Sequence, residues 1–202
     1  MMYRISCFLF ECFLRLLFKV EINGRENIPQ KPYLIVSNHA SLADPPVVGA
    51  ACKKDAVDFM AKSELFDTPI LGLWTRSVGC IRVKRGSASS GSLKEAIKRI
   101  AAGRVVAMFP EGTRSEDGTL QEAKRGIGFI VAKAKVPVLP IFISGTNIAF
   151  PKVGPLKPGS QIKAIIGKPI MPEEFFESDG SGGKDYEKVA NMVMDRIASL
   201  RE

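Results

Sequence analysis

Two residues of the sequence suit proton transfer: His39, the only histidine of the chain, and Asp44, five positions later. The apolar run 33–36 before them predicts a buried strand that ends in a loop. Asp44 followed by Pro45 predicts an N-cap and the first position of a helix. His39 would then lie at the carboxyl end of a strand, where open α/β folds bind ligands. We predict that Asp44 accepts a hydrogen bond from one ring nitrogen of His39 and leaves the other nitrogen free to take a proton.

Two later loops carry groups suited to binding an anion. Arg82 and Arg85 lie with Lys84 in a basic cluster just after Gly79, and Arg114 follows the continuous apolar run 105–109. An arginine at a strand end can bind a phosphate through two parallel hydrogen bonds, and Glu111 could orient Arg114 or bind an acceptor hydroxyl. No serine or cysteine nucleophile stands out. The pattern therefore favours a general base that activates the substrate's own hydroxyl for attack on an acyl donor.

Each feature has a simpler interpretation when it is taken alone. His39 could close a turn and Asp44 could cap a helix, since short motifs produce false matches. The basic cluster could be a solvated strand end, and Glu111 with Arg114 could form a structural ion pair. Only the order of all three loops along the chain separates a functional site from these alternatives.

Several common kinds of site are missing from the sequence. It contains no GxxxxGK[ST] phosphate-binding loop and no GxSxG nucleophile elbow. The pair Gly126 and Gly128 lacks the third glycine of a dinucleotide-binding fingerprint. A single histidine without a cluster of cysteines argues against a zinc site, so no metal is expected.

The elements that must position these loops alternate along the chain, which predicts one α/β domain: a largely parallel mixed β-sheet flanked by helices. The expected strands are 20–22, 33–36, 57–61, 81–83, 105–109, 138–143 and 162–166, the last a candidate edge strand. The expected helices are 45–52, 69–76, 92–102, 125–135 and 186–200. Residues 86–91 and 178–184 are rich in small residues, which predicts a loop and a linker.

The composition of the 202-residue chain is that of a globular protein, with 46% hydrophobic and 25% charged residues. Its net charge of +8 points to an anionic partner: membrane phospholipid, nucleic acid, a phosphorylated metabolite or an acidic carrier protein. The four cysteines have no zinc-type spacing, so reduced thiols and a cytosolic face are expected.

The N-terminal segment, residues 1–19, is apolar except for one narrow face. The charged residues Arg4, Glu11, Arg15 and Lys19 fall within about 80° of a helical wheel. No uninterrupted apolar run approaches the roughly 18 to 20 residues that span a bilayer. We predict an amphipathic helix that lies in the membrane interface, followed by a catalytic domain over 20–202. The alternative is a helix that packs on the protein's own core or on a second subunit.

Four blocks of sequence occur in a recognisable order: NHASLAD at 38–44, GCIRVKRG at 79–86, FPEGTRS at 109–115 and VPVLPI at 136–141. Over residues 31–143 the chain closely resembles the glycerolipid acyltransferase family, specifically the 1-acylglycerol-3-phosphate acyltransferases of the bacterial PlsC type. The first and third blocks are highly specific as a pair. The resemblance implies the glycerolphosphate acyltransferase-like fold.

The resemblance also implies a mechanism that agrees with the residues. His39 would deprotonate the sn-2 hydroxyl of lysophosphatidic acid, and Asp44 would hold the imidazole in its productive tautomer. The hydroxyl would attack the thioester of acyl-CoA or acyl-carrier protein and give phosphatidic acid without a covalent acyl-enzyme. The acyl donor is a substrate, so no cofactor is expected.

Further roles follow from the match to the blocks. Arg85 and Arg114 would hold the acceptor phosphate, and Pro137 would shape the acyl side. Arg82 stands where the family usually has an apolar residue, so Arg82 or Arg85 could face the phosphate. The acceptor site would be shaped by Glu111, Gly112 and Thr113, with looser matches at Lys62 and 124–126.

The expected setting is phospholipid biosynthesis on the cytoplasmic face of the cell membrane, with the enzyme bound peripherally and no nucleic acid as partner. A different lysophospholipid or lysolipid acceptor is the main alternative. A non-catalytic binder of anionic lipid or nucleic acid is a second alternative, which rests on the positive charge alone.

Overall fold

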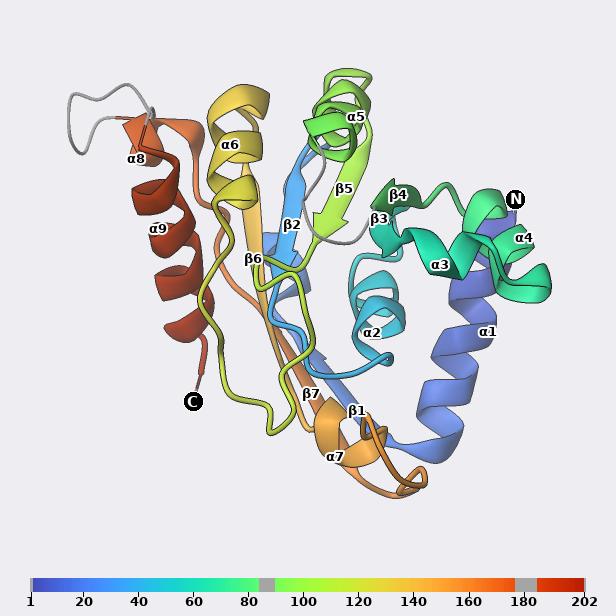
Figure 1. The fold of residues 1–202 in the computed structure, drawn as a ribbon. Helices are drawn as coiled ribbons and strands as arrows, with labels where there is room; N and C mark the ends of the chain where they lie inside the picture. The colour runs from blue at the N-terminus through green and yellow to red at the C-terminus, as the bar shows by residue number, and fades with distance from the viewer. Residues whose placement is uncertain (1, 84–89, 177–184, 202) are drawn as a thin grey trace.

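A computed structural model describes residues 2–83, 90–176 and 185–201 of the chain. These residues form a seven-stranded sheet with strand order β1-β7-β6-β2-β5-β3-β4 (Figure 1). All neighbouring strands are parallel except β6 and β7, which are antiparallel, so the predicted α/β class with a largely parallel mixed sheet is confirmed. The strands are β1 (Lys19–Asn23), β2 (Leu34–Ser37), β3 (Val57–Lys62), β4 (Ile81–Val83), β5 (Val105–Met108), β6 (Val138–Ser144) and β7 (Gln161–Ile166).

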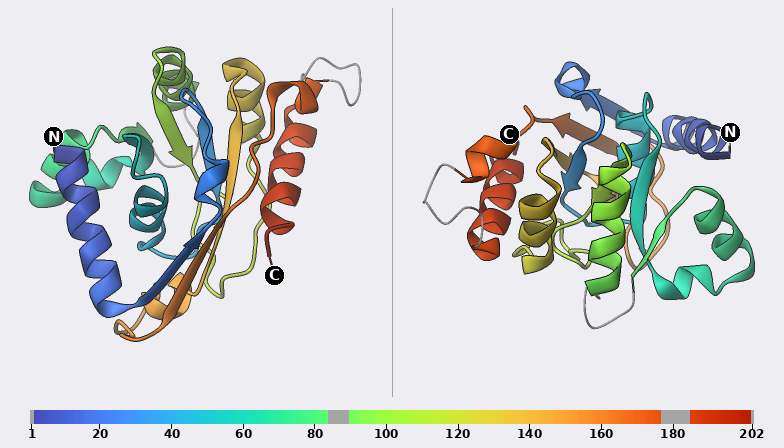
Figure 2. Two further views of the ribbon diagram at one scale, coloured as in Figure 1. Left: turned by 180° about the vertical axis from the view of Figure 1, so that it is seen from behind. Right: turned by 90° about the horizontal axis from the view of Figure 1, so that it is seen from above.

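Helices cover both faces of the sheet (Figure 2). One core lies between the sheet and α1 with α2, and the other lies between the sheet and α5, α6 and α9. The helices are α1 (Met2–Leu17), α2 (Asp44–Ala51), α3 (Ser63–Phe66), α4 (Pro69–Ser77), α5 (Ser90–Ala101), α6 (Arg125–Ala134), α7 (Thr146–Ala149), α8 (Pro172–Phe176) and α9 (Tyr186–Ala198), with a short 3-10 turn at Arg25–Asn27.

The central strand β2 shows why its sequence is continuously apolar. Ile35 faces the core beneath α1 and α2, whereas Leu34 and Val36 face the core beneath α5, α6 and α9. All residues of β2 are buried, as expected for a parallel strand with helices on both sides. The strand ends at Ser37, so the polar residues that follow emerge at the carboxyl edge of the sheet.

Two predictions about the chain are wrong. The strand predicted at the sheet edge, β7, lies between β1 and β6, because the N-terminal strand β1 pairs along its outer side. Ser90 and Gly91, predicted as part of a loop, form the first turn of α5. The predicted linker, 178–184, and the rest of the predicted loop, 86–89, lie outside the described residues.

One face of helix α1 packs on the protein's own core, as the alternative prediction had it, and another face is exposed. Leu14 and Phe18, at its C-terminal end, are buried in the core beneath α2. Trp74 of α4 packs edge-on against Phe10 of α1 and donates a hydrogen bond from its indole nitrogen to the hydroxyl of Ser6. A second apolar face remains exposed and consists of Ile5, Phe8, Leu9, Phe13 and Leu16. Among the described residues, no helix combines the length and apolar character that a bilayer span requires.

Candidate active site

The loop after β2 is fastened to the neighbouring strand by Asn38, the first residue of the NHASLAD block. Its side-chain amide donates to the carbonyl of Ile143 at 2.8 Å, and its side-chain carbonyl accepts from the N–H of the same residue at 2.7 Å. These two bonds continue the hydrogen bonding between β2 and β6 just beyond the end of β2. We assigned Asn38 no role from the sequence, although its place before His39 in the block was the available signal.

His39 and Asp44 are paired as predicted. The Nδ1 atom of His39 lies 2.7 Å from Oδ2 of Asp44, whose carboxylate is only 1% exposed. Because a carboxylate only accepts, this bond places the ring proton on Nδ1 and leaves the lone pair on Nε2. Nε2 has no hydrogen-bond partner among the residues that the structure describes. The ring is thus oriented and able to take a proton.

The prediction that Asp44 is the N-cap of the helix is wrong. The helix begins at Asp44 itself, Ala43 occupies the N-cap position, and no side chain caps the helix. The Oδ2 atom instead accepts the N–H groups of Ala40 and Ser41, both at 2.7 Å, in addition to His39. The carboxylate therefore folds back onto the loop that carries the histidine and gives that loop its shape.

The FPEGTRS loop after β5 also contacts His39, at both its ring and its backbone. The ring of Phe109 stacks on the imidazole, with the ring centroids 4.1 Å apart and the planes inclined by 18°. Oε1 of Glu111 accepts the backbone N–H of His39 at 3.2 Å, and the N–H of Ser115 donates to the His39 carbonyl at 2.8 Å. The third sequence block thus holds both the ring and the backbone of the histidine.

Glu111 is buried beside this pair, with 1% of its surface exposed. Burial raises the pKa of its carboxyl to about 7; the nearby charge of Asp44 also raises it, and the bond from the His39 N–H lowers it. Oε2 of Glu111 and Oδ1 of Asp44 are buried and have no hydrogen-bond partner in the described part of the chain. The carboxyl faces the backbone of His39, and within the described residues it makes no ion pair with Arg114.

The next residues of the same loop turn outward. Gly112 has a φ of 70°, a conformation that favours glycine, and both Gly112 and Thr113 are exposed. Arg114 is half-buried and has neither an ion pair nor a hydrogen bond from its side chain among the described residues. These residues follow Glu111 directly, so the structure brings them to the loop that holds His39.

The second basic group lies elsewhere on the sheet. Arg82, on the edge strand β4, forms an exposed ion pair with Asp67 at 3.0 Å, and its guanidinium lies 4.8 Å from the ring centre of Phe66. Lys62 is exposed at the end of β3, where it pairs in register with Val83. Arg85 lies outside the described residues. Of the two described members of this group, neither Arg82 nor Lys62 contacts His39.

Two other predicted residues, Lys124 and Pro137, lie in the described part of the chain. Lys124 precedes α6, is exposed, and ties its N–H to the carbonyl of Pro110 in the FPEGTRS loop. Pro137 lies at the amino end of β6, where its carbonyl accepts the N–H of Leu34. His39 is next to the opposite end of that strand, about 20 Å away along the chain direction. Pro137 is therefore distant from His39, and its role on the acyl side stays a prediction.

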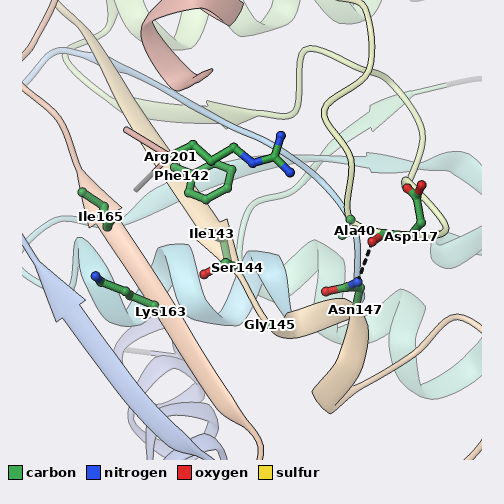
Figure 3. Close-up of a pocket in the computed structure, with 11 residues that line it drawn as sticks. Ala40, Asp117, Phe142, Ile143, Ser144, Gly145, Asn147, Lys163, Ile165 and Arg201 are labelled. Carbon is green, nitrogen blue, oxygen red and sulfur yellow. Dashed lines mark hydrogen bonds between the residues drawn. The ribbon is translucent and has the colours of Figure 1, made fainter. Parts of the chain in front are cut away.

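A pocket of about 210 Å³ borders the His39 loop at Ala40 (Figure 3). Asp117 and Asn147 lie on one side of it, joined by a 2.9 Å hydrogen bond from the Asn147 amide to the Asp117 carbonyl, and Lys163 and Arg201 lie on the other. None of the predicted site residues that the structure describes lines this pocket. The pocket therefore touches the His39 loop only at Ala40 and is not lined by the His39 ring.

A family model, individual relatives and a solved structure that match this chain are all acyltransferases. The acyltransferase family model matches residues 19–144, more than half of the chain. A chloroplast 1-acyl-sn-glycerol-3-phosphate acyltransferase of Brassica napus is 36% identical over 159 residues, which cover 76% of this chain and 45% of the relative. The chain therefore spans less than half the length of this plant relative.

Shorter relatives are covered more completely. The 1-acyl-sn-glycerol-3-phosphate acyltransferase of Bacillus subtilis is 30% identical over 177 residues, which cover 86% of this chain and 85% of the relative. The crystal structure of the 1-acyl-sn-glycerophosphate acyltransferase PlsC from Thermotoga maritima matches with a TM-score of 0.76 at 30% identity. That match covers 98% of this chain and 81% of the other, so the fold is shared over nearly the whole chain.

Proposed function

Because the chain belongs to the acyltransferase family, we propose that it is a 1-acyl-sn-glycerol-3-phosphate O-acyltransferase, which makes phosphatidic acid for phospholipid biosynthesis. One observation carries the chemistry: the buried Asp44 accepts a hydrogen bond from the Nδ1–H of His39, and Nε2 is left without a partner in the described residues. The relatives are 1-acyl-sn-glycerol-3-phosphate acyltransferases, so the proposed acceptor is lysophosphatidic acid.

In the proposed reaction, Nε2 of His39 takes the proton of the sn-2 hydroxyl as its oxygen attacks the thioester carbonyl of the donor. The C–O bond forms, the C–S bond breaks, and the departing thiolate takes the proton back from the imidazolium. Asp44 stabilises the imidazolium without accepting its proton, and the stacked ring of Phe109 limits the rotation of the imidazole. No covalent acyl-enzyme is needed, and acyl-CoA or acyl-carrier protein would serve as donor.

The acceptor phosphate would be bound by Arg114, whose guanidinium has no competing carboxylate among the described residues. Gly112 and Thr113 are exposed on the same loop and would contact the glycerol backbone. Arg82, Arg85 and Lys62 would add positive charge around the phosphate, and Arg82 would have to leave Asp67 to contact it. Glu111 would act on the acceptor site indirectly, because its carboxyl holds the backbone of His39.

We place the enzyme on the cytoplasmic face of the membrane as a peripheral protein. The exposed apolar face of α1, formed by Ile5, Phe8, Leu9, Phe13 and Leu16, would enter the interface between headgroups and acyl chains. The net charge of +8 would favour anionic phospholipid. A different lysophospholipid acceptor is the alternative, since the groups described here bind a phosphate and a hydroxyl without specifying the rest of the lipid.

The test is acyl transfer by the purified full-length protein, with lysophosphatidic acid and an acyl-CoA or acyl-carrier protein as substrates and phosphatidic acid measured by mass spectrometry. His39→Ala should lower turnover by about 10²- to 10⁴-fold, because it removes the general base. Gln30→Ala, an exposed position before the first block, is the matched control and should retain full activity.

The acceptor is tested by replacing lysophosphatidic acid with other lysophospholipids under the same conditions. The proposal is wrong if the protein transfers no acyl group to lysophosphatidic acid, or if His39→Ala matches the activity of the unaltered protein.

A further inference from the structure

The segment 146–159, which comprises α7 and the loop after it, exposes an unusual amount of apolar surface. Val153 is 87% exposed, Ile148 is 54% exposed and Leu156 is 37% exposed. Lys152 and Lys157 are also exposed within the same segment. Large apolar side chains that gather on one surface segment indicate a site of interaction with a partner or a membrane.

This segment is attached to both catalytic loops. The hydroxyl of Ser41, between His39 and Asp44, donates to the carbonyl of Phe150 at 2.6 Å. The neighbouring side chain of Leu42 is 53% exposed and so extends the apolar surface into the His39 loop itself. The segment therefore lies directly beside the proposed general base.

Two more contacts join the segment to the loop after β5. Nζ of Lys152 pairs with Oε1 of Glu116 at 2.6 Å, and the amide of Asn147 donates to the carbonyl of Asp117 at 2.9 Å. These bonds, together with that of Ser41, fix the segment relative to the FPEGTRS loop and the His39 loop. Its apolar side chains are thus presented from a supported backbone.

The other end of the segment meets the C-terminal end of α1. The N–H of Gly159 donates to the carbonyl of Leu17 at 2.7 Å, and the N–H of Lys19 donates to the carbonyl of Ser160 at 2.9 Å. Leu16, one residue before this junction, is 83% exposed. Figure 1 and the left view of Figure 2 show α7 and the following loop beside this end of α1.

We propose that the segment 146–159 is a second membrane-docking surface, which binds the anionic phospholipid bilayer together with α1 and holds the His39 loop at the lipid surface. This inference rests on the proposed function, in which the acceptor is a membrane lipid. Apolar side chains next to the exposed Lys157 match a lipid interface, where the chains bury in the acyl region and the lysine meets anionic headgroups. Lys152 is already paired with Glu116. The acceptor's acyl chain then stays in the bilayer while its glycerol phosphate reaches His39.

Vesicle binding by the full-length protein tests the docking surface. The double variant Val153→Asp and Leu156→Asp should bind vesicles of phosphatidylcholine mixed with phosphatidylglycerol about tenfold or more weakly than the unaltered protein. Met171→Asp is the matched control, since Met171 is 45% exposed and directly precedes α8, and α8 lies far from α7 in Figure 1. Phe8→Asp, on the exposed face of α1, should weaken binding as well.

The docking proposal is overturned if the double variant binds vesicles as the unaltered protein does while Phe8→Asp binds more weakly. It is also overturned if the double variant converts a dimer to a monomer in analytical ultracentrifugation without changing vesicle binding, because the segment would then be an interface between copies of the chain.

Activity separates this inference from the proposed function. The double variant should lose about tenfold in rate with lysophosphatidic acid embedded in vesicles, yet match the unaltered protein with a short-chain, monomeric lysophosphatidic acid. Equal losses with both acceptors would overturn the docking role. If the unaltered protein acts on neither acceptor, the proposed function fails, and the vesicle-binding measurement still decides the docking surface.

Tryptophan fluorescence reports the position of the segment directly. The chain has one tryptophan, Trp74, so a Trp74→Phe, Val153→Trp variant carries a single reporter on the segment. Its emission should shift to the blue and be quenched by brominated lipids when the anionic vesicles are added. Met171→Trp in the same background should show neither change. An unshifted, unquenched signal from the reporter at position 153 overturns the proposal.

Discussion

The two halves of the proposed active site are built in opposite ways. In the half that holds the base, Asp44 is 1% exposed and its Oδ2 accepts three donors, and Asn38 is fixed to Ile143 by two hydrogen bonds. In the cationic half, Arg114 has no side-chain partner among the described residues, and Arg82 has an exposed one in Asp67. The first half is rigid and buried, whereas the second is solvated.

This difference matches the physical requirements of the two tasks. A general base works only when its lone pair is directed at the proton, so the histidine must be oriented before the substrate arrives. A phosphate-binding arginine needs its charge unneutralised, and it keeps that charge in any orientation because its pKa is so high. A buried carboxylate partner would orient such an arginine but would also cancel much of its attraction for the phosphate.

The largest expected effect is in the buried half. Asp44→Asn should lower turnover by about 10²- to 10⁴-fold, because an amide can donate to Nδ1 and so favours the wrong tautomer of His39. The measurement is the acyl-transfer rate at saturating substrate. Asp55→Asn is the control, because the Asp55 carboxylate also accepts a single side-chain bond, from the hydroxyl of Tyr33. If Asp44→Asn retains full turnover, the orienting role of the carboxylate is wrong.

A smaller effect is expected in the solvated half. Arg114→Ala should raise the KM for lysophosphatidic acid by about 10- to 100-fold with little change in turnover, because it removes charge-assisted hydrogen bonds to the phosphate. Arg82→Ala tests the second arginine in the same assay. Its exposed pair with Asp67 should contribute at most about 1 kcal/mol to stability, so any large rise in KM would reflect phosphate binding.

An acceptor that lacks the phosphate separates phosphate binding by Arg114 from a role in shaping its loop. A monoacylglycerol should be used equally well by the unaltered protein and by Arg114→Ala. A loss that is the same with and without the phosphate would mean that Arg114 shapes the loop rather than binding the anion.

The third effect is on stability rather than on activity, and it depends on pH. The pKa of Glu111 rises from 4.5 to about 7 in the folded protein, so the folded chain holds a proton that the unfolded chain releases between these values. The contribution of Glu111 to the free energy of unfolding therefore falls as the pH rises from about 4.5 to about 7. Glu111→Gln keeps an oxygen for the His39 N–H and should gain up to about 3 kcal/mol over the unaltered protein above pH 7.

Thermal unfolding across this pH range measures the gain. The advantage of Glu111→Gln should be small near pH 4.5 and largest above pH 7, and Glu173→Gln, at an exposed position, should show no such trend. An advantage that does not change with pH would show that Glu111 does not carry the shifted pKa.

Much of the fold and of the buried half of the site could be predicted from the sequence, because those features are local. Each buried strand is a short apolar run, and the spacing of His39 and Asp44 lets one loop bring them together. The order of the four blocks predicted the family, which the family model and the relatives confirm. The alternation of runs also predicted the mostly parallel sheet, which the structure confirms.

Only the tertiary structure decided the features that depend on contacts between distant segments. The position of β7 depends on β1, more than a hundred residues earlier, and the partner of Glu111 proved to be the backbone of His39 rather than Arg114. Asp44 bonds to the loop rather than to the helix it begins, because three donors converge on it from residues that precede it. Local patterns specify which residues lie on strands and loops, whereas the chain's three-dimensional path decides which of those residues meet.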